Sequence, residues 1–168
     1  FMRFIAYANN EQKEEAFTAL SARKDYATAA MSLMVKDDVI QRDFDAFNAQ
    51  MEAWYYFLFG EYDSAEKQLE KLYPIASKIQ SPSALDNYNA LSGMVRLFSG
   101  DVAGSLPYFN ENINPENYQY YGYFKGLALK QAGQEEDARA IFDYIANYNF
   151  NSWEAAIVRS LAKKQLGS

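Results

Sequence analysis

The sequence predicts an all-α fold in which antiparallel helical hairpins stack into a superhelix. The first observation is a phrase that recurs after three glycines, Gly60, Gly100 and Gly133, which stand 40 and 33 residues apart. The second is that each glycine is followed by a small residue after five positions and a large apolar residue after nine: Ala65 and Leu69, Ser105 and Phe109, Ala138 and Phe142. Repeats at such spacings indicate a stacked-repeat protein.

The third observation is helical periodicity before each glycine. Apolar residues recur there every three or four positions, as in Leu91, Met94, Val95 and Phe98, which predicts the first helix of a hairpin. A glycine that ends a helix adopts the left-handed conformation without the strain of a Cβ. Acidic or polar residues follow each glycine and suit the start of a second helix. Each glycine is therefore expected to be the turn of a hairpin.

A fainter copy lies upstream, where Lys24 takes the place of the glycine and Ala29 and Leu33 take the small and large positions. Small residues also stand seven positions before each glycine: Ala53, Gly93 and Gly126. This pattern resembles the tetratricopeptide repeat (TPR). The resemblance implies three clear repeats plus one degenerate one, with units at about 10–43, 46–79, 86–119 and 119–152. Pro74 and Pro107 fall inside expected second helices and should bend or delay them.

The two ends differ from the repeats. Asn151 and Ser152 offer an N-cap for a capping helix at 152–166, with Trp153, Ala156 and Ile157 on its apolar face and Glu154 in water. Phe1 to Tyr7 has the composition of the last turns of an apolar helix. We therefore expect the chain to be a fragment of a longer protein that continues upstream.

Composition limits the classes of function. The chain has 168 residues, 49% of them hydrophobic, which is typical of one soluble domain, and no apolar run of the length that spans a bilayer. A net charge of −6 opposes binding to nucleic acid, which requires clustered basic residues. There is no cysteine and no convincing signal peptide, so the compartment stays open between cytoplasm and periplasm.

The chemistry of the side chains argues against an enzyme. With no histidine and no cysteine, catalysis would depend on carboxylates, Lys, Tyr or Ser. The acidic clusters, such as Asp37–Asp38 and Glu135–Asp137, fall at helix starts and exposed faces, and their spacing is not that of a calcium loop. The sequence predicts no catalytic residue, no metal site and no cofactor.

Aromatic residues carry the stronger signal. Two stretches, Trp54–Phe59 and Tyr118–Phe124, supply more aromatics than one inward helix face can bury. If the TPR layout holds, a concave groove is lined by Phe47, Gln50, Trp54, Phe57, Ala90, Met94, Leu97, Tyr120, Tyr123 and Leu127. Tyr and Trp are favoured in binding surfaces, although packing between repeats would explain the same residues.

These observations lead to three hypotheses. The first is a non-catalytic module, in a regulatory or scaffold protein of bacterial type, that binds a protein, as a peptide or partner helix, in the aromatic groove. The second is a structural domain that packs against the rest of its own chain or self-associates through Phe1–Tyr7. The third is an accessory domain of an enzyme that acts on a glycan or a peptide.

Overall fold

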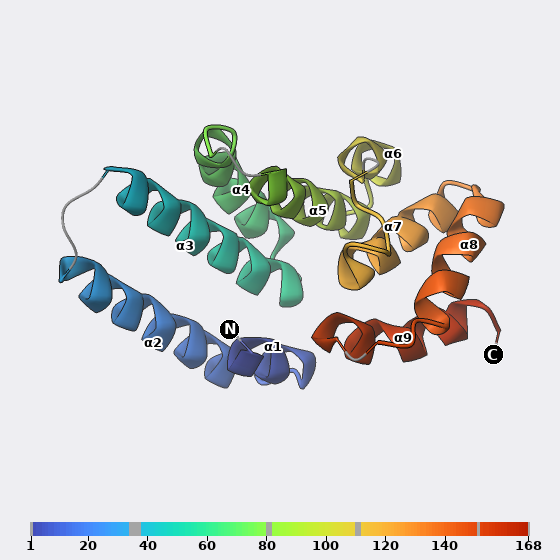
Figure 1. Cartoon of the computed structure of the whole chain (residues 1–168), viewed down its shortest axis with the longest axis horizontal. Helices are drawn as coiled ribbons and strands as arrows, with labels where there is room; N and C mark the ends of the chain where they lie inside the picture. The colour runs from blue at the N-terminus through green and yellow to red at the C-terminus, as the bar shows by residue number, and fades with distance from the viewer. Residues whose placement is uncertain (1, 34–37, 80–81, 110–111, 151, 168) are drawn as a thin grey trace. The chain divides into compact units, whose positions relative to one another are not determined.

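The computed structural model describes residues 2–33, 38–79, 82–109, 112–150 and 152–167, and within them the chain is helical with no strand (Figure 1). The chain divides into two compact units, Phe1–Tyr88 and Asn89–Ser168. Because the first unit ends at Tyr88, the division falls inside a helix. The predicted all-α repeat of helical hairpins is confirmed in the described residues.

The first unit contains two hairpins. Helix α1 (Met2–Asn9) pairs with α2 (Lys13–Ser32), and α3 (Asp38–Leu58) pairs with α4 (Tyr62–Ala76). Helix α5 (Pro82–Phe98) begins in this unit and continues into the second.

The second unit holds the remaining helices. The short α6 (Val102–Ser105) and the 3₁₀ helix η1 (Leu106–Tyr108) follow α5, and α7 (Gln119–Gln131) pairs with α8 (Glu135–Ala146). The last helix, α9 (Trp153–Gln165), packs against both α7 and α8.

The three predicted turn glycines share one geometry. Their φ angles are 73° at Gly60, 96° at Gly100 and 80° at Gly133, all in the left-handed region. In each turn the glycine N–H donates to the carbonyl three residues before it, and the next N–H donates to the carbonyl five residues before it; Glu61 to Tyr56, at 2.8 Å, is one case. These bonds satisfy carbonyls that the end of a helix leaves without partners. The prediction of hairpin turns at these glycines is confirmed.

A fourth turn of the same kind lies at Glu11, a residue that the repeat pattern did not indicate. Glu11 has φ 59°, and it donates to Ala8 at 3.1 Å while Gln12 donates to Tyr7 at 2.9 Å. Five and nine positions after it stand Ala16 and Leu20, which are both buried. The first hairpin therefore repeats the geometry of the others with glutamate in the glycine position.

The turn predicted at Lys24 is wrong. Helix α2 runs without interruption from Lys13 to Ser32, so Lys24 is one of its interior residues. The physical reason is that the segment after Lys24 holds alanines at residues 27, 29 and 30 and no residue that ends a helix. The hairpin expected at about 10–43 is replaced by α1 and α2.

Close backbone packing explains the small residues before the turns. A Cβ added at Gly93 would stand 2.9 Å from the ring of Phe109, and one added at Gly126 would stand 2.7 Å from the ring of Phe142. Both rings are buried, as are the small residues Ala65, Ser105 and Ala138. Phe142 of the second helix, and Phe109 just after Tyr108, thus each lie directly on a glycine of the first helix of their hairpin.

The two prolines act differently. Pro74 lies inside α4, which continues to Ala76, whereas α6 ends at Ser105 and Pro107 falls in η1. Proline removes a backbone donor and favours a tighter turn at this point. The unit predicted at 86–119 therefore lacks a full second helix, because residues 112–118 are turns and irregular structure.

The predicted capping helix is present as α9, and Ser152 is its N-cap, since Ser152 Oγ accepts a hydrogen bond from the N–H of Ala155 at 3.0 Å. Asn151 lies outside the described residues. The buried face differs from the prediction: Ala155, Val158 and Ala162 are buried, whereas Trp153 and Ala156 are exposed and Ile157 is half-buried. Glu154 is not in water, because it is half-buried and contacts α7.

Candidate protein-binding surface

The predicted groove residues of the first unit all lie on α3, and two of the four are buried. Trp54 and Phe57 are 1% and 7% exposed, and their rings meet edge to face at 6.1 Å. Phe47 and Gln50 are half-buried. The guanidinium of Arg23, from α2, lies 3.6 Å from the centre of the Phe47 ring and covers it. These aromatics contribute to the interior of the unit more than to its surface.

The predicted groove residues of the second unit are also mostly interior. Ala90, Met94 and Leu97 on α5 and Tyr120 and Tyr123 on α7 are buried, and Leu127 is half-buried. The Tyr123 ring packs on Phe142 at 5.7 Å. Burial raises the pKa of the phenol groups of Tyr120 and Tyr123.

These side chains therefore do not form the expected exposed groove. Six of them are buried: Trp54, Phe57, Met94, Leu97, Tyr120 and Tyr123. For the aromatics the reason is that α3 is packed against α4 and α2, and α7 against α8 and α9, so each of these helices buries more than one face. The self-association expected through Phe1–Tyr7 stays a prediction, but Phe4 and Ile5 are buried in the first unit instead of exposed. Phe1 lies outside the described residues.

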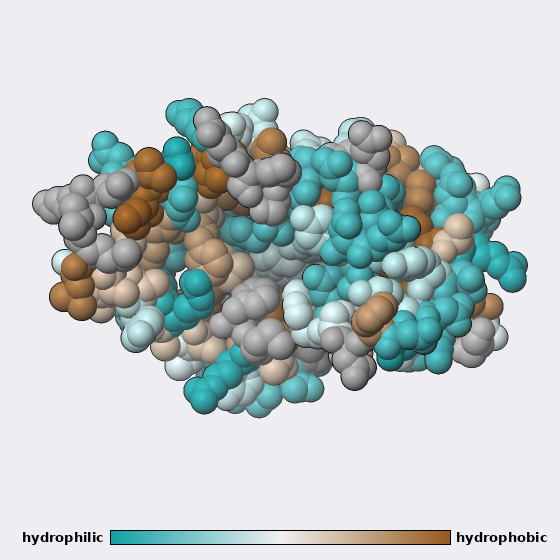
Figure 2. Space-filling view, viewed as in Figure 1, coloured by the Kyte–Doolittle hydropathy of each residue, from teal (hydrophilic) through white to brown (hydrophobic). Residues whose placement is uncertain are grey.

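Large apolar side chains are exposed in the second half of α2 and at the start of α3, and also at scattered positions such as Phe17, Tyr73 and Phe150. Tyr26 is 79% exposed and Leu33, just after α2, is 89% exposed; Val39 is half exposed. From Ala22 to the end of α2 no side chain is buried. Figure 2 shows apolar side chains at the surface where α2 ends and α3 begins. Exposed apolar side chains that gather in one region of the surface are typical of an interaction site.

Five apolar residues, the half-buried Ala19 and four exposed ones that end with Leu33 just after α2, form a regular line, which we call the α2 seam. Its members are spaced alternately three and four positions apart, so they share one face of the helix: Ala19, Ala22, Tyr26, Ala29 and Leu33. This is the spacing of the a and d positions through which two helices pack in a coiled coil. The seam thus has the spacing of a helix-packing face.

Helix α1 covers only the beginning of the seam. A hollow of about 550 Å³ lies between the two helices, and Ala19 and Ala22 line it together with Arg3, Phe4 and Tyr7 of α1. Glu14 and Glu15 stand at its edge. Since α1 has 8 residues and α2 has 20, α1 leaves the far half of the seam uncovered.

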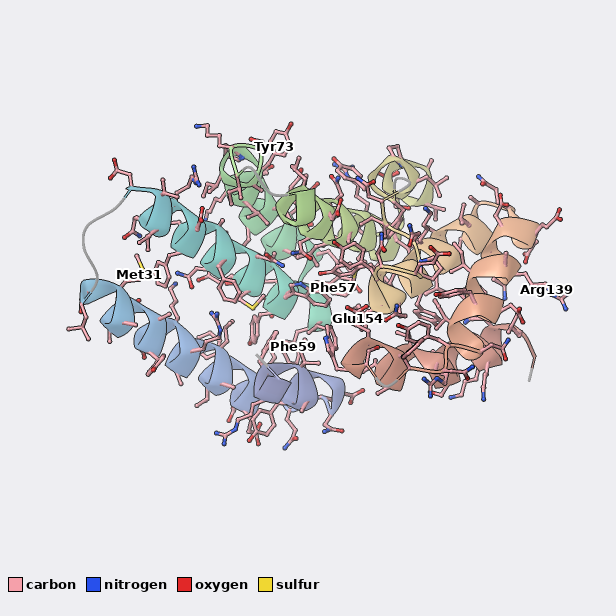
Figure 3. All side chains as sticks on the ribbon, viewed as in Figure 1. Met31, Phe57, Phe59, Tyr73, Arg139 and Glu154 are labelled. Atoms are coloured by element: carbon pink, nitrogen blue, oxygen red, sulfur yellow. The ribbon has the colours of Figure 1, made fainter. Side chains whose placement is uncertain are left out.

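The opposite side of α2 is held to α3 by long side chains. Arg23 stacks on Phe47, and Lys24 Nζ bonds Glu52 Oε1 at 2.7 Å. Figure 3 shows Met31 extending from α2 toward α3, and it is half-buried. Partial burial lowers the pKa of the Arg23 guanidinium. These contacts fix α2 so that the seam faces away from α3.

The second unit has a hollow of its own. It measures about 400 Å³ and is lined by charged residues of α7 and α8 over the ring of Phe142. Lys130 there donates to Gln165 Oε1 at 3.1 Å, and Figure 3 shows Arg139 pointing outward from α8. The lining contains two acidic and two basic side chains, Glu135 and Glu136 with Lys130 and Arg139, so it favours no single ligand charge.

Comparison with known proteins gives no further assignment, since no family model, no curated protein and no solved structure matches the chain. Over the described residues, no helix is both long and apolar enough to cross a membrane. Among those same residues, no three acidic side chains gather where they could hold a metal ion.

Sequence reasoning missed the seam because it placed a turn at Lys24, which divided α2 into two short helices. The signal was nevertheless present. Five apolar residues spaced alternately three and four apart run through residues 19–33 without an intervening glycine or proline. A single long helix with an apolar face was the alternative interpretation of that segment.

Proposed function

We propose that this chain is a non-catalytic protein-interaction module whose binding surface is the exposed half of α2. The observation that carries the proposal is the exposure of Tyr26 and Leu33, at 79% and 89%, on a helix that is otherwise fixed in place by α1 and α3. Apolar side chains of this size are costly to leave in water. A partner that covered them would gain the free energy of their burial.

The arrangement of the helices supports a scaffold. The hairpins close on themselves through turns and buried small residues, so the interior does not need a ligand to fill it. The resemblance to TPR proteins, which bind peptides and proteins, agrees with this role. The site differs from the predicted groove, because it lies on the second helix of a hairpin instead of on the first helices.

A crosslinking experiment tests the proposal. A photoreactive phenylalanine analogue replaces Tyr26 in one protein and Phe150 in a control, since Phe150 is also exposed, at 74%, but lies in the second unit. Any protein that crosslinks at position 26 in the producing cells, and not at position 150, is identified, purified and titrated calorimetrically.

We expect the purified partner to bind the wild type at least 10-fold more tightly than the double variant Tyr26→Ser, Leu33→Ser, and to bind Phe150→Ser as the wild type. Equal affinity for the wild type and the double variant contradicts the proposal. So does a pattern in which position 26 yields no crosslink beyond that of position 150.

A further inference from the structure

We infer that the occupant of the α2 seam is a single amphipathic helix of a partner protein, laid antiparallel to α2 in line with α1, with basic residues along its edge. This inference rests on the proposed function and specifies the chemistry of the partner. It draws on three features of the first unit: the spacing of the seam, its continuity with the α1–α2 contact, and the charges beside it.

The spacing selects a helix as the occupant. A seam with members alternately three and four residues apart matches the ridge of a second helix along its whole length. An extended peptide presents side chains on one face at every second residue, so their spacing would not match that of the seam. Ala19, Ala22 and Ala29 are small, so the backbone of the occupant can approach closely, and Tyr26 and Leu33 supply the large contacts.

The contact between α1 and α2 sets the position and direction of the occupant. Helix α1 runs antiparallel to α2 through the turn at Glu11 and lines the hollow with Ala19 and Ala22. At 1.5 Å per residue, α1 extends for about 12 Å and α2 for about 30 Å. The same seam continues past α1 through Tyr26, Ala29 and Leu33, so a helix in line with α1 prolongs an interface that already exists (Figure 1).

The charges beside the seam favour a basic helix. Asp25 lies next to Ala22 and Ala29 on the helix surface and is exposed, and Glu14 and Glu15 are exposed at the hollow. The two basic residues of this part of α2 are engaged elsewhere, Arg23 on Phe47 and Lys24 with Glu52. The chain as a whole carries a net charge of −6. A partner with Lys or Arg along its edge therefore meets complementary charge.

The probe for this inference is a pair of synthetic helical peptides of three heptads with Leu at the a and d positions. One peptide has Lys at the flanking e and g positions and the other has Glu, and both carry a fluorophore. Fluorescence anisotropy at low salt measures the affinity of the intact chain for each. We expect the Lys peptide to bind at least 10-fold more tightly than the Glu peptide, with the difference shrinking at high salt.

Variants locate the binding. Tyr26→Asp with Leu33→Asp should weaken the Lys peptide at least 10-fold, Asp25→Lys should reduce its advantage over the Glu peptide, and the control Phe150→Asp should change neither affinity. Circular dichroism verifies that each variant keeps its helix content.

Results of two kinds, from the binding assay and from sedimentation, overturn the inference. One is equal binding of both peptides, or binding that Tyr26→Asp with Leu33→Asp leaves unchanged. The other is a dimer in sedimentation experiments that these substitutions abolish, which assigns the seam to a second copy of the chain. Equal peptide binding leaves the crosslinking result at position 26 unchanged, and a dimer would appear there as a crosslink of the chain to itself. Failure of this inference is therefore distinguishable from failure of the proposed function, in which position 26 gives no specific crosslink.

Discussion

The carboxylate of Glu154 on α9 accepts a hydrogen bond from the backbone N–H of Tyr120 on α7, with Oε2 and N 2.9 Å apart. The N-cap residue of α7, Tyr118, makes no capping bond with its own side chain, so α9 supplies the cap that α7 lacks. Ser152 adds a second link by donating to Gln119 Oε1 at 3.2 Å. Figure 3 shows Glu154 between the starts of the two helices. These two contacts attach the start of α9 to the start of α7.

Removal of this cap should weaken the second unit. We expect Glu154→Ala to lower the free energy of unfolding by about 1 kcal/mol, the usual cost of losing an N-cap acceptor. Urea titration measures the loss, and hydrogen exchange at the Tyr120 amide should accelerate. Glu154→Gln is the matched control because its amide oxygen can still accept, and it should lose less than Glu154→Ala. Equal losses would show that the bond to Tyr120 does not contribute.

The same residue predicts a pH dependence. Burial raises the pKa of the Glu154 carboxyl, although its backbone hydrogen bonds oppose the change. Because the pKa of Glu154 is raised in the folded state, proton uptake by this carboxyl stabilises the folded protein. This contribution is complete below the ordinary pKa of about 4.3 and is lost as pH rises through the folded-state pKa. The unfolding free energy of the wild type minus that of Glu154→Gln should therefore fall between pH 4 and pH 7. A difference that rises over this range contradicts the prediction.

The contact between Gly126 and Phe142 predicts a packing defect. Because an added Cβ would stand 2.7 Å from the ring, we expect Gly126→Ala to reduce the unfolding free energy by about 1–3 kcal/mol, as overpacking does. The second substitution Phe142→Leu should recover part of that loss. Urea titration of the two single variants and the double variant gives the coupling. Simple additivity would show that the ring does not oppose the new methyl group.

The turns at Glu11 and Gly133 predict opposite responses. Glu11→Gly should raise the unfolding free energy by about 0.5–1 kcal/mol, because glycine removes the left-handed strain at φ 59°. The larger conformational entropy that glycine loses on folding offsets part of this gain. Gly133→Ala should cost about 1 kcal/mol, since φ is 80° and open space surrounds the position. Thermal unfolding compares the two variants with the wild type, and the same sign for both would refute this account.

The exposure of the α2 seam predicts tolerance in the isolated chain. Tyr26→Ser and Leu33→Ser should each change the unfolding free energy by no more than about 0.5 kcal/mol. Trp54→Ala should instead cost about 3–5 kcal/mol, because Trp54 is 1% exposed. Denaturant titration separates the two classes. A large loss at position 26 would place Tyr26 in the core and remove the basis of the seam.

The hairpins at Gly60, Gly100 and Gly133 could be predicted from sequence because their determinants are local. A left-handed glycine, a small residue five positions on and a large one nine positions on are all recorded within about ten residues. The turn at Glu11 could not be found in this way, since glutamate seldom adopts positive φ. Its Ala16 and Leu20 were present, but the turn itself carried no glycine.

The candidate site was harder to predict because it depends on which faces the neighbouring helices cover. Helical spacing places Trp54 and Phe57 on α3, but only the packed unit shows that both are buried. The bond from Tyr120 to Glu154 joins residues 34 positions apart, and neither residue type signals the other. Spacing along the chain gives the face of a helix, whereas the covering of that face is a property of the tertiary structure.

The hydrogen bonds that close the four turns each connect residues no more than five positions apart. Such short loops cost little entropy to close, and proteins dominated by local contacts fold quickly. We therefore expect the hairpin of α1 and α2 to form while the ribosome is still translating the second unit. The apolar side chains of this hairpin would then be buried, and so protected from aggregation, before the C-terminal residues are synthesised.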